Sequence, residues 1–203
     1  LRGAAAGSRR VIPLSPMDLR IASVIVAHFL APSVSASGEQ PFAYHARIDI
    51  IGESVADAAE GAHLLGWRGS RVQMAAALLV LVDEESRFDE RVHAGSRHPV
   101  WTADDGRSTC LMQVQRSRYV QGWEHLAGID STSTFHCLSA GARLFSAQYH
   151  SCSQWPVSQD SMALAFTAYG VGHCGPPSQL GKDRAAKWAR ILRRLEQAGK
   201  TPS

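Results

Sequence analysis

Apolar positions recur at helical spacing along most of this chain, and they predict a mainly α-helical fold. A first helix, which ends near Gly66, carries one apolar face formed by Ile51, Val55, Ala58, Ala62 and Leu65. Residues 71–88 are apolar on nearly every side, which predicts a buried helix. No stretch alternates cleanly between apolar and polar residues, so the pattern predicts no strand.

Three further helices follow from the same periodicity. Residues 138–150 place Leu138, Ala142, Phe145 and Tyr149 on one side, and residues 159–168 form the next apolar stretch. Glycines and prolines between residues 170 and 177 break the chain before a final helix over 183–198, whose apolar side holds Trp188, Ile191, Leu192 and Leu195. Residues 89–107, with glycine, proline and mixed charge, predict a loop that rims any site at the end of the buried helix.

The beginning of the chain has the pattern of a secretory signal peptide. Met17 and Arg20 precede a short apolar core, residues 21–30, and a small-residue cleavage pattern at Val34-Ser35-Ala36 follows. We therefore predict two parts: residues 1–36, an upstream extension plus signal peptide with the natural start at Met17, and residues 37–203, a single domain. The apolar core is about half the length of a membrane-spanning helix, so we expect no stable membrane insertion, with an uncleaved anchor as the alternative.

Charge is distributed unevenly along the chain. The formal net charge is +3, and residues 1–36 alone carry +3, so the remainder is close to neutral. Residues 181–203 have seven basic and two acidic residues, whereas residues 37–180 have ten basic and fifteen acidic ones. Basic residues do not form a stripe with aromatic partners, so the sequence does not predict nucleic-acid binding.

Four cysteines, Cys110, Cys137, Cys152 and Cys174, are an even number in a chain that we expect to be exported to the periplasm or cell envelope. This favours one or two disulfides. If residues 137–152 form one continuous helix, its ends lie about 22 Å apart, too far for Cys137 to bond Cys152. The pairing otherwise stays open. The spacing matches no zinc pattern, and we expect no metal site.

Asp83, Glu84 and Glu85 close the predicted buried helix, where acidic residues oppose the helix macrodipole. Acidic residues in such an unfavourable position suggest that one of them has a chemical role. Cleavage of a glycosidic bond needs a carboxylic acid that stays protonated near neutral pH, and burial in an apolar cleft raises a carboxyl pKa accordingly. Glu85, beside Phe88, is placed for that role, while Glu84 is turned about 100° away around the helix.

Three short motifs, in this order and at these spacings, resemble the transglycosylase SLT family. They are Glu85-Ser86-Arg87-Phe88, Leu111-Met112-Gln113-Val114 and Ala168-Tyr169-Gly170-Val171-Gly172. Members of that family are lysozyme-like enzymes that cut the glycan strands of bacterial peptidoglycan, and the resemblance covers about residues 51–197. It implies a lysozyme-like helical domain with an active-site groove.

The resemblance implies a role for each matching residue. Glu85 would be the catalytic general acid and then base, and the substrate-binding residues would be Ser86, Met112, Gln113, Tyr169 and Gly170. Among these, Gln113 would hydrogen-bond the sugar and Tyr169 would lie against Glu85. Two positions depart from the family pattern: Cys110 replaces a glycine, which suggests a disulfide or tight packing at the groove wall, and Gly170 replaces an asparagine.

The implied reaction cleaves the MurNAc-GlcNAc β-1,4 bond and forms 1,6-anhydroMurNAc, with peptidoglycan glycan strands as the partner and without a cofactor or metal. Goose-type lysozyme shares the first two motifs and gives an alternative, a hydrolase using Asp104 or Asp105 as second carboxylate; Gln115 occupies the position of its other aspartate. A third reading is a non-catalytic peptidoglycan-binding scaffold. The sequence leaves open a role in wall turnover or in a cell-envelope transport machine.

Overall fold

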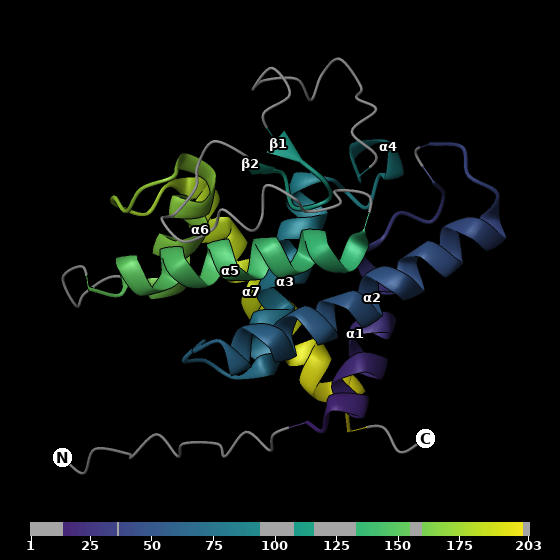
Figure 1. Cartoon of the computed structure of the whole chain (residues 1–203), viewed down its shortest axis with the longest axis horizontal. Helices are drawn as coiled ribbons and strands as arrows, with labels where there is room; N and C mark the ends of the chain where they lie inside the picture. Colours follow the sequence, from purple (N-terminus) through teal and green to yellow (C-terminus); the bar gives the residue numbers. More distant parts are fainter. Residues whose placement is uncertain (1–13, 36, 94–107, 116–132, 155–159, 201–203) are drawn as a thin grey trace, which may run out of the picture.

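The computed structural model of the chain describes residues 14–35, 37–93, 108–115, 133–154 and 160–200. The fold is mainly α-helical, as predicted (Figure 1). The helices are α1 (Pro16–Leu30), α2 (Pro41–Leu64), α3 (Arg71–Glu85), α4 (Glu90–His93), α5 (Thr134–Cys152), α6 (Ser161–Val171) and α7 (Gln179–Ala198). β1 (Ser108–Thr109) and β2 (Val114–Gln115) form one short antiparallel pair, with Ser108 opposite Gln115.

Helix α3 lies at the centre, packed against α2, α5 and α7 (Figure 1). Its N-terminus is fixed by a capping box, in which Ser70 and Gln73 satisfy each other's backbone N–H groups. Nearly every residue from Val72 to Val82 is buried, because its apolar sequence has no polar face to turn toward water. The helix ends at Glu85, since Arg87 and Phe88 take positive φ angles of 49° and 60°.

Helix α2 confirms the first predicted apolar face in four of its five positions. Ile51, Val55, Ala58 and Ala62 are buried. The prediction was wrong for Leu65, whose residue surface is 65% exposed. The reason is that α2 ends at Leu64, so Leu65 is the cap and leaves the helical register.

The segment with the signal-peptide pattern forms α1, whose buried side packs against α2 and α7. Close approach of α1 to α2 depends on Gly52, because a Cβ atom there would lie 2.5 Å from Val24 Cα. Export with cleavage after residue 36 stays a prediction, and such cleavage would remove a helix that contributes Leu19 and Val26 to the core. Among the described helices, none has the length and apolar character that crossing a membrane requires.

Two disulfides confirm the expectation drawn from the even number of cysteines. Cys110 bonds Cys137, and Cys152 bonds Cys174, with Cα–Cα distances of 5.9 and 5.4 Å. Because α5 is continuous from Thr134 to Cys152, its two cysteines lie at opposite ends and each pairs elsewhere, as the helix length required. Bridges of this kind are typical of exported proteins.

The last two helices match the predicted ones but have different ends. Helix α6 ends at Val171, where Gly172 takes φ 86° and caps the helix, in agreement with the predicted glycine break. Helix α7 begins at Gln179, four residues before the predicted start, because the Ser178 side chain accepts a hydrogen bond from the Gly181 N–H. Helix α7 packs against α3, and its residues Arg184 and Lys187 pair with the acids at the end of α3.

Candidate functional site

Glu85 is the last residue of α3, and its side chain is 21% exposed. Burial raises the pKa of this carboxyl above its usual value, and the charge of Glu84 adds to the effect. The positive charge and hydrogen bond of Arg184 act in the opposite direction. Burial is the largest of these influences, so the carboxyl is easier to protonate than a solvated glutamate.

Arg184, on α7, forms an ion pair with Glu85: its Nη2 atom lies 2.7 Å from Glu85 Oε1. The arginine side chain is only 6% exposed, and among the described residues its Nε and Nη1 atoms have no hydrogen-bond partner. The sequence prediction missed this residue. One signal was present, because Arg184 stands at helical spacing from Trp188, Ile191 and Leu195 and thus on the apolar side of α7.

Lys187, one turn further along α7, accounts for the other two acids at the end of α3. Its Nζ atom lies 2.5 Å from Asp83 Oδ2 and also pairs with Glu84. Helix α7 therefore supplies two cations to three carboxylates, with Lys187 serving Asp83 and Glu84 and Arg184 serving Glu85. These contacts offset the unfavourable position of the acids at the end of a helix dipole.

Tyr169, on α6, is buried, and its hydroxyl donates a 2.8 Å hydrogen bond to the Met112 carbonyl oxygen. Burial raises its pKa well above the usual value, and the charge of Glu85 raises it further. The tyrosine therefore joins α6 to the segment between β1 and β2 within the electrostatic reach of Glu85. The substrate-binding role that the resemblance implies for Tyr169 stays a prediction.

Met112 and Gln113 have structural contacts of their own. Met112 is fully buried and packs on Gly141 of α5, where an added Cβ would lie 2.3 Å from Met112 Cε. Gln113 has a positive φ of 47°, and its side-chain Nε2 donates to the Cys110 carbonyl oxygen at 2.9 Å. The amide predicted to bind sugar is therefore turned back onto its own turn.

Ser86 and Gly170 flank the pair formed by Glu85 and Arg184. Ser86 is buried, and its hydroxyl donates to the Val82 carbonyl oxygen at 2.8 Å, which closes the end of α3. Gly170 is exposed, and a Cβ there would lie 4.0 Å from Arg184 Nη1 with no nearer neighbour. The position where the family has asparagine is therefore open and lies beside the arginine.

The predicted second carboxylates fall outside the described residues. Asp104 and Asp105 belong to the stretch 94–107, as does most of the predicted rim loop. The described beginning of that loop is the short helix α4. Within the described residues, no group of three or more histidine, cysteine, aspartate or glutamate side chains is placed to hold a metal ion.

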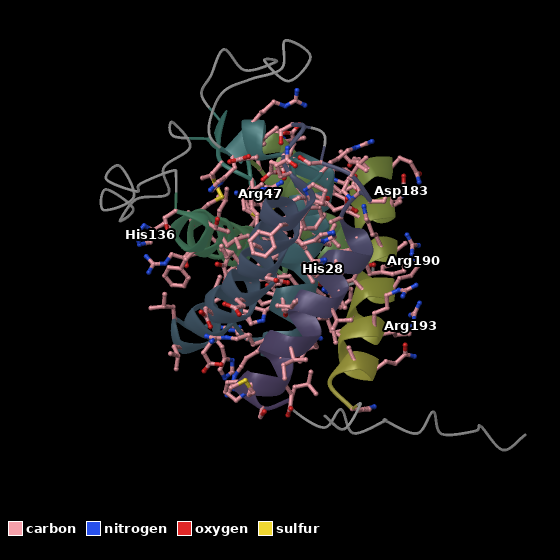
Figure 2. The ribbon with its side chains drawn as sticks, turned by 90° about the vertical axis from the view of Figure 1, so that its right-hand side faces the viewer. His28, Arg47, His136, Asp183, Arg190 and Arg193 are labelled. Carbon is pink, nitrogen blue, oxygen red and sulfur yellow. A yellow bond between two sulfur atoms is a disulfide. The ribbon has the colours of Figure 1, made fainter. Side chains whose placement is uncertain are left out.

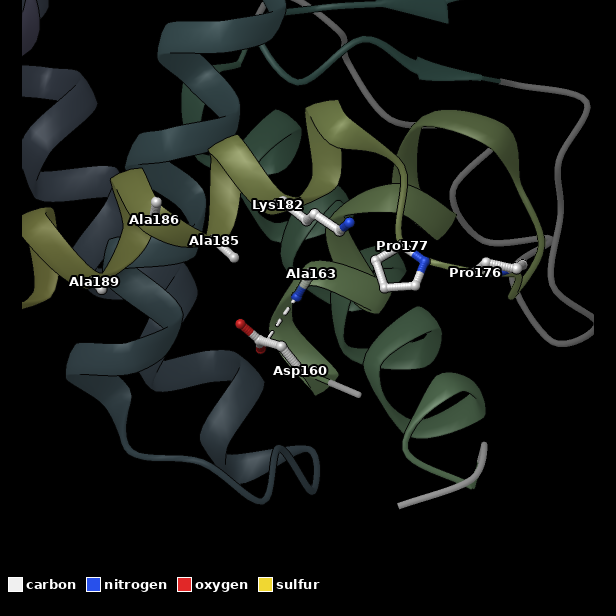
Figure 3. Close-up of a pocket in the computed structure, with 8 residues that line it drawn as sticks. All are labelled: Asp160, Ala163, Pro176, Pro177, Lys182, Ala185, Ala186 and Ala189. Atoms are coloured by element: carbon white, nitrogen blue, oxygen red, sulfur yellow. Dashed lines mark hydrogen bonds between the residues drawn. The ribbon is translucent and has the colours of Figure 1, made fainter. Parts of the chain in front are cut away.

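A cavity of about 620 Å³ lies between the start of α6 and α7, lined by alanines of α7 together with Asp160, Lys182 and Pro177 (Figure 3). Its charged residues already have structural roles or solvent contact: Asp160 caps α6 through the N–H groups of Met162 and Ala163, and Lys182 is exposed. Glu85 is not among its lining residues, so this cavity is separate from the candidate site.

Comparison with known proteins does not identify a relative: no family model, no curated protein and no solved structure matches the chain. A function therefore has to be argued from the site itself. The feature to explain is a mostly buried carboxyl group on which burial and an arginine act in opposite directions. A group in that situation is suited to holding a proton and to releasing it.

Proposed function

We propose that the protein is a peptidoglycan lytic transglycosylase, in which Glu85 acts as general acid and then as general base. The observation that carries the proposal is the burial of this one carboxyl at the end of α3, which raises its pKa. General-acid catalysis near neutral pH requires such a shift. The neighbouring contact between Tyr169 and Met112 joins the other two motifs of the family pattern.

In the proposed first step, Glu85 gives its proton to the glycosidic oxygen as the bond between that oxygen and the anomeric carbon of MurNAc breaks. The acetamido group of the same sugar stabilises the cationic centre. In the second step the MurNAc 6-hydroxyl attacks the anomeric carbon, and the Glu85 carboxylate takes the hydroxyl proton. The acid is regenerated, the product is a 1,6-anhydro sugar, and no water is consumed.

Arg184 is placed to assist between these steps. Once Glu85 has lost its proton, the guanidinium group 2.7 Å away stabilises the carboxylate. The same contact also makes the resting acid harder to protonate. A glycosidase that hydrolyses would instead need a second carboxylate to activate water or to attack the sugar.

The test is digestion of purified peptidoglycan followed by mass spectrometry of the soluble products. Anhydro-muropeptides are expected from the unaltered protein and none from Glu85→Gln, which keeps an oxygen to accept a hydrogen bond from Arg184. Glu84→Gln is the matched control, because it removes an acid of the same helical turn that pairs with Lys187 instead. Equal activity in Glu85→Gln and the unaltered protein would contradict the proposal.

A second candidate function, a non-catalytic peptidoglycan-binding scaffold, is favoured by one observation. Arg184 pairs with Glu85 in a largely buried place, and such pairs also occur as structural elements. The same digestion separates the alternatives. Products heavier by one water would indicate a lysozyme and direct attention to Asp104 and Asp105, whereas binding to peptidoglycan without any product would indicate the scaffold.

A further inference from the structure

The outer side of α1 carries an apolar stripe: Met17, Ile21, Ile25 and Phe29. These residues recur every four positions, so they lie along one side of the helix over about 18 Å. Each is between 45% and 64% exposed, on the side away from the buried residues of α1. A continuous apolar stripe on a surface helix marks a contact surface more often than isolated apolar residues do.

The stripe has a basic border on the side of α7. Arg190, Arg193 and Arg194 are exposed, and none of them forms an ion pair with another described residue. The guanidinium carbon of Arg194 lies 3.6 Å from the centroid of the Phe29 ring, which connects the basic border to the stripe. In Figure 2 α7 lies beside α1, and Arg190 and Arg193 extend from the side of α7 that is away from α1.

The opposite border of the stripe, on the side of α2, is acidic. Asp57 and Asp49 pair with Arg20 and His28 of α1, at 2.7 Å in both cases, and Glu53 is exposed between them. The three carboxylates outnumber Arg20 and His28 together, so this border has a net negative charge. The stripe thus separates a negative border from a positive one.

We propose that this face binds a second copy of the chain, forming a symmetric dimer through α1. A two-fold axis parallel to α1 places the stripe of one copy against the stripe of the other. The same rotation exchanges the two borders, so the acidic border of α2 faces the basic border of α7 in the partner, twice. A two-fold axis perpendicular to α1 would instead place like charges together, so the charges select the parallel arrangement.

The charges also argue for a second copy over a membrane. A flat anionic bilayer would attract the arginines but repel the carboxylates on the other side of the stripe. A second copy satisfies both borders and covers the apolar residues. The proposal is independent of any activity at Glu85, because no residue of the candidate site belongs to this face.

The first test measures the mass of the full chain by sedimentation velocity, after intact-mass measurement shows that α1 is present. A dimer is expected, and Ile25→Asp should raise its dissociation constant by at least about tenfold, because a carboxylate would be buried in the apolar contact. Leu180→Asp is the matched control: Leu180 is 51% exposed, as Ile25 is, but lies at the start of α7.

A charge exchange tests the parallel arrangement. Glu53→Arg alone and Arg193→Glu alone should each weaken the dimer, since like charges then face one another at both borders. An equimolar mixture of these two variants should restore dimerisation, because both borders of the mixed dimer are again opposite in charge. Higher salt should weaken the unaltered dimer, since these charges are exposed.

Three results would overturn the proposal: a monomeric full chain at all accessible concentrations, a dimer that Ile25→Asp leaves unchanged, or a mixture of the charge variants that stays monomeric. A monomer that co-sediments with vesicles of phosphatidylglycerol, and loses that binding in Ile25→Asp, would assign the face to a membrane instead.

Discussion

Arg184 and Glu85 are both largely buried, where either charge would be unfavourable without the other. The arginine is nearly fully buried, and the glutamate largely so, with a single 2.7 Å contact between them. The position of Glu85 could be predicted because it follows directly from the end of an apolar helix. The pairing of Glu85 with Arg184 could not be predicted, because α7 is about 100 residues away along the chain and only packing brings the two together.

The acidic cluster itself has a simpler explanation than the sequence suggested. Asp83 and Glu84 are satisfied by Lys187, so their presence at a helix end does not require chemistry. Likewise, Gln113 has the residue type expected for sugar binding. Its backbone has a positive φ, and its side-chain amide already donates a hydrogen bond to the Cys110 carbonyl oxygen within the same turn. Residue type alone does not tell whether a polar group is already occupied.

At this scale we predict that Arg184→Met raises the pKa of Glu85 further, because the influence that lowers it is removed. A carboxyl with a raised folded-state pKa contributes stability that is present below its unfolded value of about 4.5 and is lost as pH rises through the folded value. The window of this loss should therefore move upward in the variant. Carboxyl NMR titration of Glu85 checks this, with the exposed Arg190→Met as the control. An unchanged pKa would contradict the assigned role of Arg184.

A second prediction concerns Glu39, whose pKa Arg47 lowers to about 2 through a 2.6 Å ion pair. Arg47 also donates to the Phe88 carbonyl oxygen at 2.8 Å and so holds the turn after α3. The stability that the Glu39–Arg47 ion pair contributes is present above the unfolded pKa of Glu39, 4.5, and is lost as pH falls toward 2. Glu39→Gln should lose roughly 2 kcal/mol of unfolding free energy at neutral pH. Denaturant unfolding at several pH values measures it, and the variant's curve should meet that of the unaltered protein in acid.

At the scale of the elements, periodicity predicted the long helices, whereas their ends depended on single contacts. Helix α7 starts early because Ser178 caps it, and α2 stops before Leu65. The pair formed by β1 and β2 has two residues in each strand, too few to give an alternating pattern. Helix capping and strand pairing depend on contacts of single residues, so the apolar periodicity of a whole helix does not predict them.

Helix α5 offers a sharp test of packing. Gly141→Ala should destabilise the fold by about 1–3 kcal/mol, because the added methyl group would overlap Met112, which is fully buried. Gly61→Ala, in α2, is the matched control with no neighbour within 4 Å, and it should stabilise by up to about 1 kcal/mol through helix propensity. Thermal unfolding of both variants decides the matter, and equal shifts in the two would contradict the packing described.

At the scale of the whole molecule, the uncertain boundary was the beginning of the domain. A stretch of ten residues with eight apolar ones, followed by small residues, fits a signal peptide and also fits a core helix, because both need an apolar composition. In the structure α1 packs closely on α2, since Gly52 on α2 admits the backbone at Val24, and cleavage after residue 36 stays a prediction. Because Gly52 lies in another segment, the local pattern of residues 21–36 does not reveal this packing.

Gly52→Ala therefore tests whether α1 belongs to the folded protein. A Cβ at this position would lie 2.5 Å from Val24 Cα and 2.8 Å from Val24 N, and backbone atoms cannot rotate away. In the full chain the substitution should lower the free energy of unfolding by about 1–3 kcal/mol. In a chain that starts at residue 37, the same substitution should be neutral or stabilising. Denaturant unfolding of both lengths gives the comparison, and equal effects in the two would show that α1 does not pack on α2.

The two disulfides give the molecule a further property. Each joins one end of α5 to a distant segment, so residues 110–137 and 152–174 are both enclosed in covalent loops. A protease that cuts once between Cys110 and Cys137, or once between Cys152 and Cys174, leaves its two fragments bonded. A nicked molecule would migrate as one band without reductant and as two with it. Damage in these stretches would therefore leave the protein in one piece in surroundings rich in proteases.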